Sequence, residues 1–99
     1  MKNQIQFIDT KGSDTLEDFV IERLDALEDK YEWVTNAAVF LKEEKHDSNK
    51  NYVCEIRLSV PGPQLFASAN EDSFHKAIVN VAGALSIQLE KHKAKHISN

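Results

Sequence analysis

Alternation of apolar and polar residues predicts strands in four stretches of this chain, and the clearest of them covers residues 52–60. Neighbouring side chains of a strand point to opposite faces of a sheet, so a period of two indicates one buried and one wet face. The side chains expected to face the core are Tyr52, Cys54, Ile56, Leu58 and Val60. A slip of one residue would turn all five toward water, which makes this register a sharp prediction.

Three further patterns predict strands on either side of this one, at residues 2–10, 37–44 and 65–69. A polar loop is expected at residues 46–51, where no apolar residue interrupts the run. The Pro-Gly-Pro turn at residues 61–63 is short, so it predicts a hairpin between the strands that flank it.

Two stretches show the three- and four-residue spacing of apolar residues that is typical of one face of an α-helix. The first begins after Ser13, a good N-cap, and ends near Lys30. Its apolar stripe consists of Leu16, Phe19, Val20, Leu24, Leu27 and Tyr31. The second follows a polar break at residues 70–73 and ends in a basic tip at residues 91–95. Its stripe consists of Phe74, Ala77, Ile78, Val81, Leu85 and Leu89.

The predicted fold is a single α+β domain, residues 1–99, with the element order β-α-β-β-β-α. Short loops favour antiparallel pairing of the last three strands, and the helical crossover favours a parallel neighbour for the first. Each helix buries little alone, so both helices should pack on the same face of a four-stranded mixed sheet.

The formal net charge is −4 and is unevenly distributed, with 7 Lys and Arg against 12 Asp and Glu in residues 1–50. Any RNA contact must therefore use a local basic patch. The sequence contains no run of 18 apolar residues and no signal-peptide pattern, which favours a cytoplasmic location without a membrane partner. Cys54, the single cysteine, has apolar neighbours two residues away on either side and is interpreted as a small core residue.

The most specific motifs lie in residues 64–95. A strand with Ala-Ser-Ala at residues 67–69 is followed by a helix that starts with Asp-Ser-Phe-x-x-Ala-Ile and ends with Gln-Leu-x-Lys-His-Lys. These motifs resemble the ribosome hibernation-promoting family, which includes the ribosome-associated inhibitors and was once labelled sigma-54 modulation protein. The chain looks like the short form of that family, without the C-terminal dimerisation domain.

This resemblance implies a non-enzymatic hibernation factor that occupies the decoding region of the small ribosomal subunit and inhibits translation in stress or stationary phase. Its partner would then be 16S rRNA, and the protein would be a monomer or a weak homo-oligomer. No cofactor, no metal and no small-molecule substrate are expected. The sequence agrees, since it contains no phosphate-binding loop, nucleophile elbow or paired metal motif.

In the family, basic side chains on and between the two helices lie against 16S rRNA, whose phosphates demand Lys and Arg. The positions that keep a positive charge here, and that the resemblance implies bind RNA, are Arg23, Lys30, Lys76, Lys91, Lys93 and Lys95. Residues 15–30 also hold six acids, so the three lysines at the end of the second helix should supply much of the phosphate contact. We expect these lysines to share one continuous surface with Arg23 and Lys76.

Some of these residues allow a second interpretation. The lysines at 91–95, with His92 and His96, form either a phosphate clamp or a solvated helix end that offsets the helix dipole. The two histidines are four residues apart, a spacing that suits metal ligands, but no third ligand is fixed nearby. Tyr31 and Trp33 are either an exposed base-stacking pair or, as we prefer, a hydrophobic plug between helix and strand.

Small residues around Gly83 point to close approach of another molecule, such as an RNA sugar, or to crowding between the helices. Ile87 is expected to be exposed, with Val79 on the flank of the same surface. The alternative function is therefore that of a diverged paralogue. It would act as a protein-interaction regulator through the acidic first helix and the Gly83–Ile87 strip.

Overall fold

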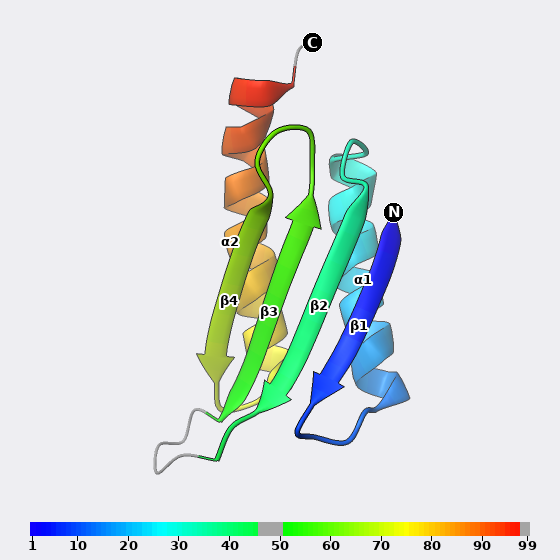
Figure 1. Cartoon of the computed structure of the whole chain (residues 1–99), viewed down its shortest axis with the longest axis vertical. Helices are drawn as coiled ribbons and strands as arrows, with labels where there is room; N and C mark the ends of the chain where they lie inside the picture. Colours follow the sequence, from blue (N-terminus) through cyan, green and yellow to red (C-terminus); the bar gives the residue numbers. More distant parts are fainter. Residues whose placement is uncertain (46–50, 98–99) are drawn as a thin grey trace.

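The chain forms four strands and two helices in the order predicted from the sequence (Figure 1). The computed structural model describes residues 1–45 and 51–97. The elements are β1 (Lys2–Ile8), α1 (Asp14–Lys30), β2 (Asn36–Glu43), β3 (Tyr52–Ser59), β4 (Leu65–Glu71) and α2 (Phe74–His96).

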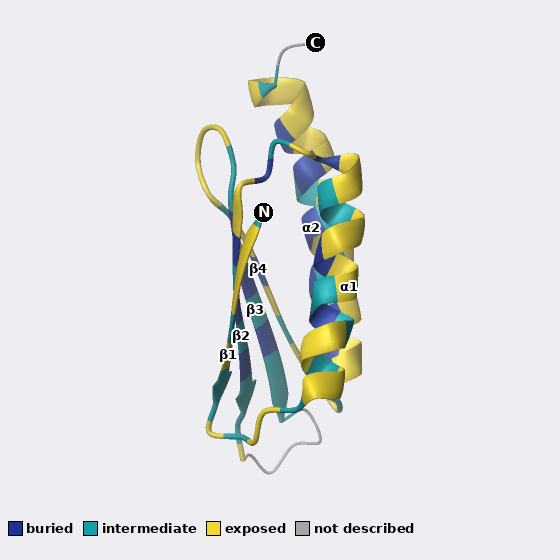
Figure 2. Cartoon of the chain, turned by 90° about the vertical axis from the view of Figure 1, so that its right-hand side faces the viewer, coloured by how far each residue is buried: buried dark blue, intermediate teal, exposed yellow. Residues whose placement is uncertain are grey.

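The four strands form one mixed sheet in the order β1-β2-β3-β4, with both helices packed on one face (Figure 2). Strand β1 is parallel to β2 because α1 carries the chain back to the same end of the sheet. The other neighbouring strands are antiparallel. This arrangement confirms the predicted fold class, and it leaves the second face of the sheet uncovered by the described segments.

The predicted register of β3 is confirmed. Cys54, Ile56 and Leu58 are buried under the helices, and Tyr52 and Val60 are partly buried against the same core. Pairing of β3 with β2 and β4 on either side fixes this register, because a one-residue slip would expose the whole apolar set.

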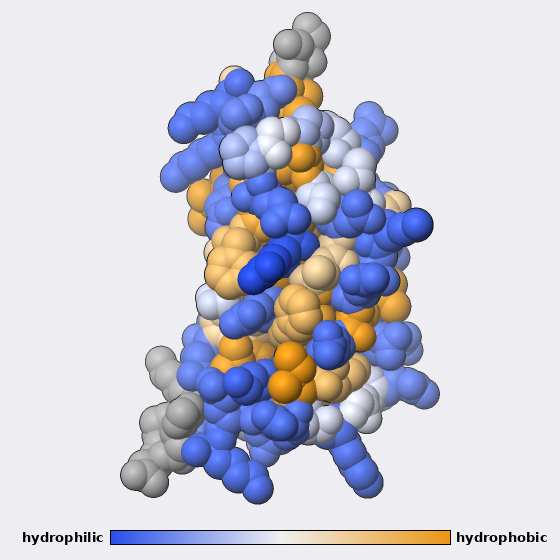
Figure 3. Space-filling model, viewed as in Figure 1, coloured by the Kyte–Doolittle hydropathy of each residue, from blue (hydrophilic) through white to orange (hydrophobic). Residues whose placement is uncertain are grey.

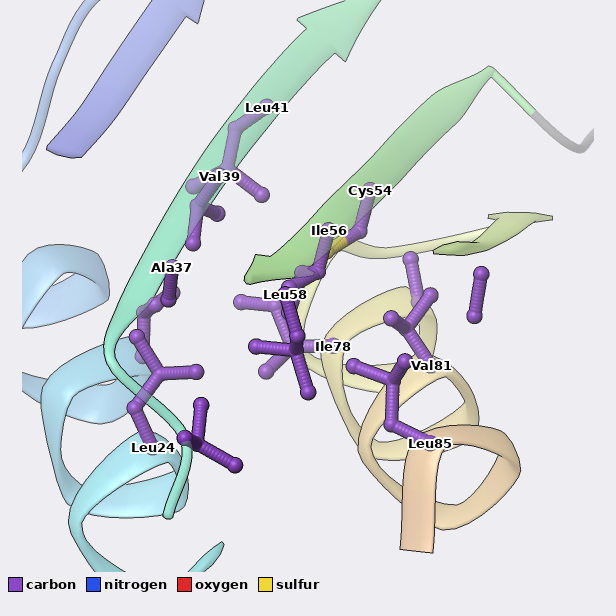
Figure 4. Close-up of a cluster of buried hydrophobic side chains, with 14 of the residues drawn as sticks. Leu24, Ala37, Val39, Leu41, Cys54, Ile56, Leu58, Ile78, Val81 and Leu85 are labelled. Carbon is purple, nitrogen blue, oxygen red and sulfur yellow. The ribbon is translucent and has the colours of Figure 1, made fainter. Parts of the chain in front are cut away.

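Both predicted apolar stripes lie in the core between the helices and the sheet (Figure 4). All six stripe residues of α2 are buried, including Leu85 and Leu89, which are fully inaccessible to solvent. In the first stripe, Val20, Leu24 and Tyr31 are buried, and Leu16, Phe19 and Leu27 pack against the core from its edges. Full burial of each large aliphatic side chain stabilises the fold by about 1.5–3 kcal/mol.

Two strand boundaries differ from the prediction by two residues, and the other differences are of one residue. Strand β1 ends at Ile8 rather than residue 10, because Asp9 adopts a left-handed conformation with φ 56° that a strand cannot continue through. Strand β4 extends through the predicted polar break to Glu71, which pairs with Tyr52 of β3. The loop predicted at residues 46–51 lies, apart from its last residue, outside the described residues.

Serine side chains cap the start of both helices. Ser13 accepts a hydrogen bond from the backbone N–H of Leu16 at 3.3 Å, as its predicted N-cap role requires. Ser73 accepts one from the N–H of Lys76 at 3.2 Å and begins α2. Among the described helices, neither is apolar enough over a sufficient length to cross a membrane.

Candidate nucleic-acid interface

The six cations implied to bind RNA are exposed and lie on the two helices, which run side by side in the same direction (Figure 1). Contacts at both ends hold the helices together. Phe19 of α1 meets His75 of α2 with ring centroids 4.8 Å apart, and Tyr31 beyond α1 contacts Glu90 of α2. Because the helices are parallel, their first turns share one end of the molecule and their last turns share the other.

At the first end, Arg23 and Lys76 flank an aromatic contact between the helices. The guanidinium of Arg23 lies over the Phe19 ring, with Cζ 5.1 Å from its centroid, and His75 touches the same ring. Lys76 is exposed and forms an ion pair with Asp72, Nζ to Oδ2 3.0 Å. The charge of Lys76 is thus partly offset by a neighbouring carboxylate, whereas Arg23 lies over an aromatic ring, which carries no opposing charge.

At the other end, Lys30 and Lys93 lie on either side of Glu90. The hydroxyl of Tyr31 donates a hydrogen bond to Glu90 Oε2 at 2.5 Å. This bond, aided by the charges of Lys30 and Lys93, lowers the pKa of Glu90 below its ordinary value. Glu90 is therefore ionised at neutral pH and neutralises part of this basic pair.

Lys91 and Lys95 lie on the other side of α2 from Lys93. They line a shallow pocket of about 270 Å³ with the β3–β4 turn, together with Gln88. Lys93 instead lines a different pocket with Glu90. The reason is the helical period, because residue 93 lies two positions, or ~200°, from both 91 and 95. The expectation that the three C-terminal lysines share one surface is therefore wrong, and their contact with phosphates stays a prediction.

The expected continuous basic surface is also wrong, although acidic residues are not the reason. No charged residue lies on α2 between Lys76 and Glu90, a span of about 20 Å along the helix. This span exposes small and apolar side chains instead. The acids of α1 lie mostly on its outer face, whereas Arg23 and Lys30 lie toward α2. The structure thus places Arg23 and Lys76 around one contact between the helices, and the other four cations near the end of α2.

His92 is not part of the exposed positive tip, which corrects its assignment from the sequence. The residue is 5% exposed, and its Nε2 donates a hydrogen bond to the carbonyl oxygen of Pro61 in the β3–β4 turn. Its ring stacks on Trp33 and on His96, with centroids 5.6 and 4.3 Å away. The signal was present in the sequence, because residue 92 continues the i, i+4, i+7 stripe from Leu85 and Leu89.

The preferred interpretation of Tyr31 and Trp33 as a plug is confirmed. Tyr31 is 1% exposed, and Trp33 packs against the core from the edge, with the two rings 5.7 Å apart. Together with His92 and His96 they form a chain of four contacting rings, which connects the end of α2 to the corner after α1. His92 also connects this chain to the β3–β4 turn through Pro61. These rings position the helix end that carries Lys91 and Lys95.

In the strip from Gly83 to Ile87, the residues Gly83, Ala84 and Ile87 are exposed to solvent. A Cβ atom placed at Gly83 would meet no atom within 4 Å, so crowding between the helices does not explain this glycine. Ile87 is 61% exposed and Val79 is 41% exposed, as predicted. The core does not use these exposed residues, so contact with another molecule remains the open interpretation for them.

The described residues contain no group of three or more His, Cys, Asp or Glu side chains arranged to hold a metal ion. Cys54 is fully buried, and burial, with a smaller effect from the charge of Glu55, raises its pKa to about 12. A protonated, inaccessible thiol is a poor nucleophile, so the interpretation of Cys54 as a core residue is confirmed.

Comparison with known sequences places this geometry in context. A profile of the protein family described as Sigma 54 modulation protein / S30EA ribosomal protein matches residues 3–97. The chain is 35% identical over 83 residues to the ribosome hibernation promoting factor of Pseudomonas putida, covering 84% of this chain and 78% of that protein. It is 33% identical over 85 residues to the factor of the same name from Azotobacter vinelandii, covering 86% of this chain and 76% of that protein.

Two solved structures share the fold. A ribosomal subunit interface protein from Coxiella burnetii superposes with a TM-score of 0.84 at 21% identity, over 96% of this chain and 100% of that one. The N-terminal domain of Protein Y from Thermus thermophilus superposes with a TM-score of 0.77 at 20% identity, over 92% of this chain and 98% of that one.

Proposed function

The chain belongs to the Sigma 54 modulation protein / S30EA ribosomal protein family, and from this membership we propose that it is a ribosome hibernation factor, which binds the ribosome and keeps it inactive. The observation that carries the proposal is the similarity to two ribosome hibernation promoting factors over more than four fifths of the chain. Ribosome binding would place the protein in the cytoplasm, and its action would be stoichiometric binding without catalysis.

We further propose that the contact is made with 16S rRNA of the small subunit through the helix layer. The cations of this layer are Arg23, Lys30, Lys76, Lys91, Lys93 and Lys95. These cations should contribute unequally to the affinity for RNA, because Glu90 offsets the charges of Lys30 and Lys93, and Asp72 offsets that of Lys76. Lys91 and Lys95 share one side of the helix without an acidic residue in the pocket that they line, so they should contact phosphates most strongly.

Co-sedimentation with purified 30S, 50S and 70S particles, at salt concentrations from 50 to 300 mM, tests this proposal. The wild type is expected to pellet with 30S and 70S particles and to be released as salt rises. Each neutralised phosphate contact removes about 0.7–0.9 from the slope of log affinity against log salt. The double variant Lys91→Gln, Lys95→Gln should therefore lower the slope by about 1.4–1.8.

The single variant Lys93→Gln should lower the slope less than either lysine on the opposite side of the helix, because Glu90 already offsets its charge. Lys11→Gln is a matched control, since Lys11 is exposed near the opposite end of the molecule, in the bend after β1. Equal slopes for the double variant and the Lys11 control would move the RNA contact away from the end of α2.

A second candidate function rests on the exposed Gly83–Ile87 strip and the acidic outer face of α1. In this alternative the chain is a diverged family member that regulates a protein partner with a basic or apolar surface. Absence of pelleting at every salt concentration, by wild type and variants alike, would favour it. The substitution Ile87→Asp would then abolish capture of that partner and leave the fold intact, because the side chain is 61% exposed.

A further inference from the structure

The sheet face opposite the helices is uncovered by the described segments, and its side chains form a regular grid (Figure 2). The strand register defines two central rows across the sheet, which are Gln4, Ala38, Arg57 and Phe66, then Gln6, Phe40, Glu55 and Ser68. Figure 3 views this face and shows apolar side chains gathered in its middle with hydrophilic ones around them. The face thus combines exposed rings with polar groups.

Two phenylalanines on this face are available for contact. Phe66 is 46% exposed, and Phe40 is partly exposed two strands away. Arg57 lies between them in the grid, and its Cζ is 5.6 Å from the centroid of the Phe66 ring. From strand spacing and rise, the Cα atoms of the two phenylalanines are about 12 Å apart. Flat rings at this spacing, with a cation between them, form a surface on which separate bases can stack.

A groove of about 640 Å³ beside these rings has a lining suited to nucleotides. Phe40 forms part of its wall, and Lys2 and Arg57 supply two positive charges. Its other polar lining residues with side chains on this face are Gln4, Asn36, Gln64 and Ser59, which supply amides and a hydroxyl. Among the described residues, no carboxylate lines it, although the chain has 16 Asp and Glu residues. Amides pair with base edges, and cations without competing acids attract phosphates.

A neighbouring groove of about 330 Å³ differs in charge. Phe40 and Arg57 line it as well, but so does Glu55, and Lys42 in its wall is paired with Glu44 at 3.5 Å. Phosphates should therefore follow the first groove, from Lys2 toward Arg57, and avoid the second.

We propose that the open sheet face binds a short segment of single-stranded RNA, with bases stacked on Phe66 and Phe40 and phosphates held by Arg57 and Lys2. Four-stranded sheets with exposed aromatic rings suit unpaired bases, because every base has a flat face to stack. A second copy of this chain fits the face less well. In such a dimer, Lys2 and Arg57 of each copy would need carboxylates from the same face of the other copy. The two central rows of that face contain only one carboxylate, Glu55. The proposal goes beyond ribosome binding by the helix layer and does not depend on it.

Fluorescence anisotropy of a labelled eight-nucleotide RNA, with the full chain in 50 mM salt, tests this site. Uridine and adenosine octamers should both bind, and unlabelled octamer should compete better than duplex RNA of the same length or than AMP. Phe66→Leu keeps an apolar side chain but removes the ring. It should weaken binding about 5- to 150-fold, the range that loss of one stacked base gives.

Matched variants make the test specific. Phe66→Tyr should retain wild-type affinity, because it keeps the ring, and Arg57→Gln should lower the salt slope by about 0.7, the value for one contact to single strands. Lys91→Gln with Lys95→Gln, on the helix layer, should leave octamer binding unchanged. Thermal melts should show that each variant is folded, because Phe66 and Arg57 are exposed.

Three results would overturn the proposal. The first is no octamer binding by the wild type. The second is binding that Phe66→Leu leaves intact or that the helix-layer variant abolishes, since the RNA would then lie elsewhere. The third is sedimentation showing a wild-type dimer that Phe66→Leu dissociates while no RNA binds, because a second copy would then cover the face. Ribosome pelleting by the same variants reports separately on the hibernation function.

Discussion

Replacing Gly83 with alanine should stabilise this protein, and the structure fixes the size of the effect. Gly83 lies within α2, in the exposed strip, and an added Cβ would meet no atom within 4 Å. The substitution therefore creates neither a clash nor a new contact. What remains is the intrinsic difference between glycine and alanine in a helix interior, about 1 kcal/mol in favour of alanine.

Urea denaturation and thermal melting measure this gain. A gain of about 1 kcal/mol should raise the melting temperature by roughly 4–8 °C for a domain of this size. Gly62→Ala is the matched control with the opposite sign, because Gly62 has φ +92° and its Cβ would lie 3.1 Å from His96 Nδ1. It should destabilise the protein by about 1–2 kcal/mol, the cost of a left-handed conformation for an L-residue.

An unchanged or lower stability of Gly83→Ala would refute this reasoning. It would mean either that the helix is interrupted at residue 83 or that another molecule, such as a second copy, contacts the strip in solution. Ribosome pelleting adds a functional result, since a contact centred on Lys91 and Lys95 predicts unchanged binding of this variant. A more stable variant with weaker ribosome binding would move the contact to the strip.

Three further predictions concern buried or hydrogen-bonded groups. His92→Ala should lower the free energy of unfolding by about 1–3 kcal/mol because it leaves the carbonyl of Pro61 without its donor, and urea denaturation should show partial recovery in His92→Gln, which keeps a donor. Tyr31→Phe removes the donor to Glu90, so the pKa of Glu90 should rise toward its ordinary value of 4.5 in an NMR titration of the carboxyl carbon. Because the pKa of Glu90 is lowered in the folded state, the hydrogen bond contributes stability above pH 4.5, and this stability is lost as the pH falls through the folded pKa. The wild type and Tyr31→Phe should therefore approach the same free energy of unfolding in acid. The thiol of Cys54, whose pKa is raised to about 12 mainly by burial, should react with a thiol reagent at neutral pH only as fast as the protein opens, whereas reaction at the rate of a small free thiol would contradict its burial.

The sequence predicted those features that short-range patterns encode. The alternation in β3 identified its buried side chains, and the apolar stripe of α2 identified every buried position from Phe74 to Leu89. The cap at Ser13 was also predictable, because a capping side chain bonds a backbone N–H only three residues away. The family followed from motifs in residues 64–95, which are local as well.

Only the tertiary structure decided which distant residues meet. From its residue type, His92 was predicted to be part of the exposed basic helix end. In the structure, α2 packs against the β3–β4 turn, and His92 is buried there with a hydrogen bond to Pro61. The helical period alone places Lys93 opposite Lys91 and Lys95, but only the packing of α2 decides that Lys91 and Lys95 lie beside the β3–β4 turn and Lys93 beside Glu90. Phe40, Arg57 and Phe66 come from three strands, and only the strand order places them on one open face. The physical reason is that residue spacing determines which face of an element is apolar, while the pairing and packing of whole elements determine what each face meets.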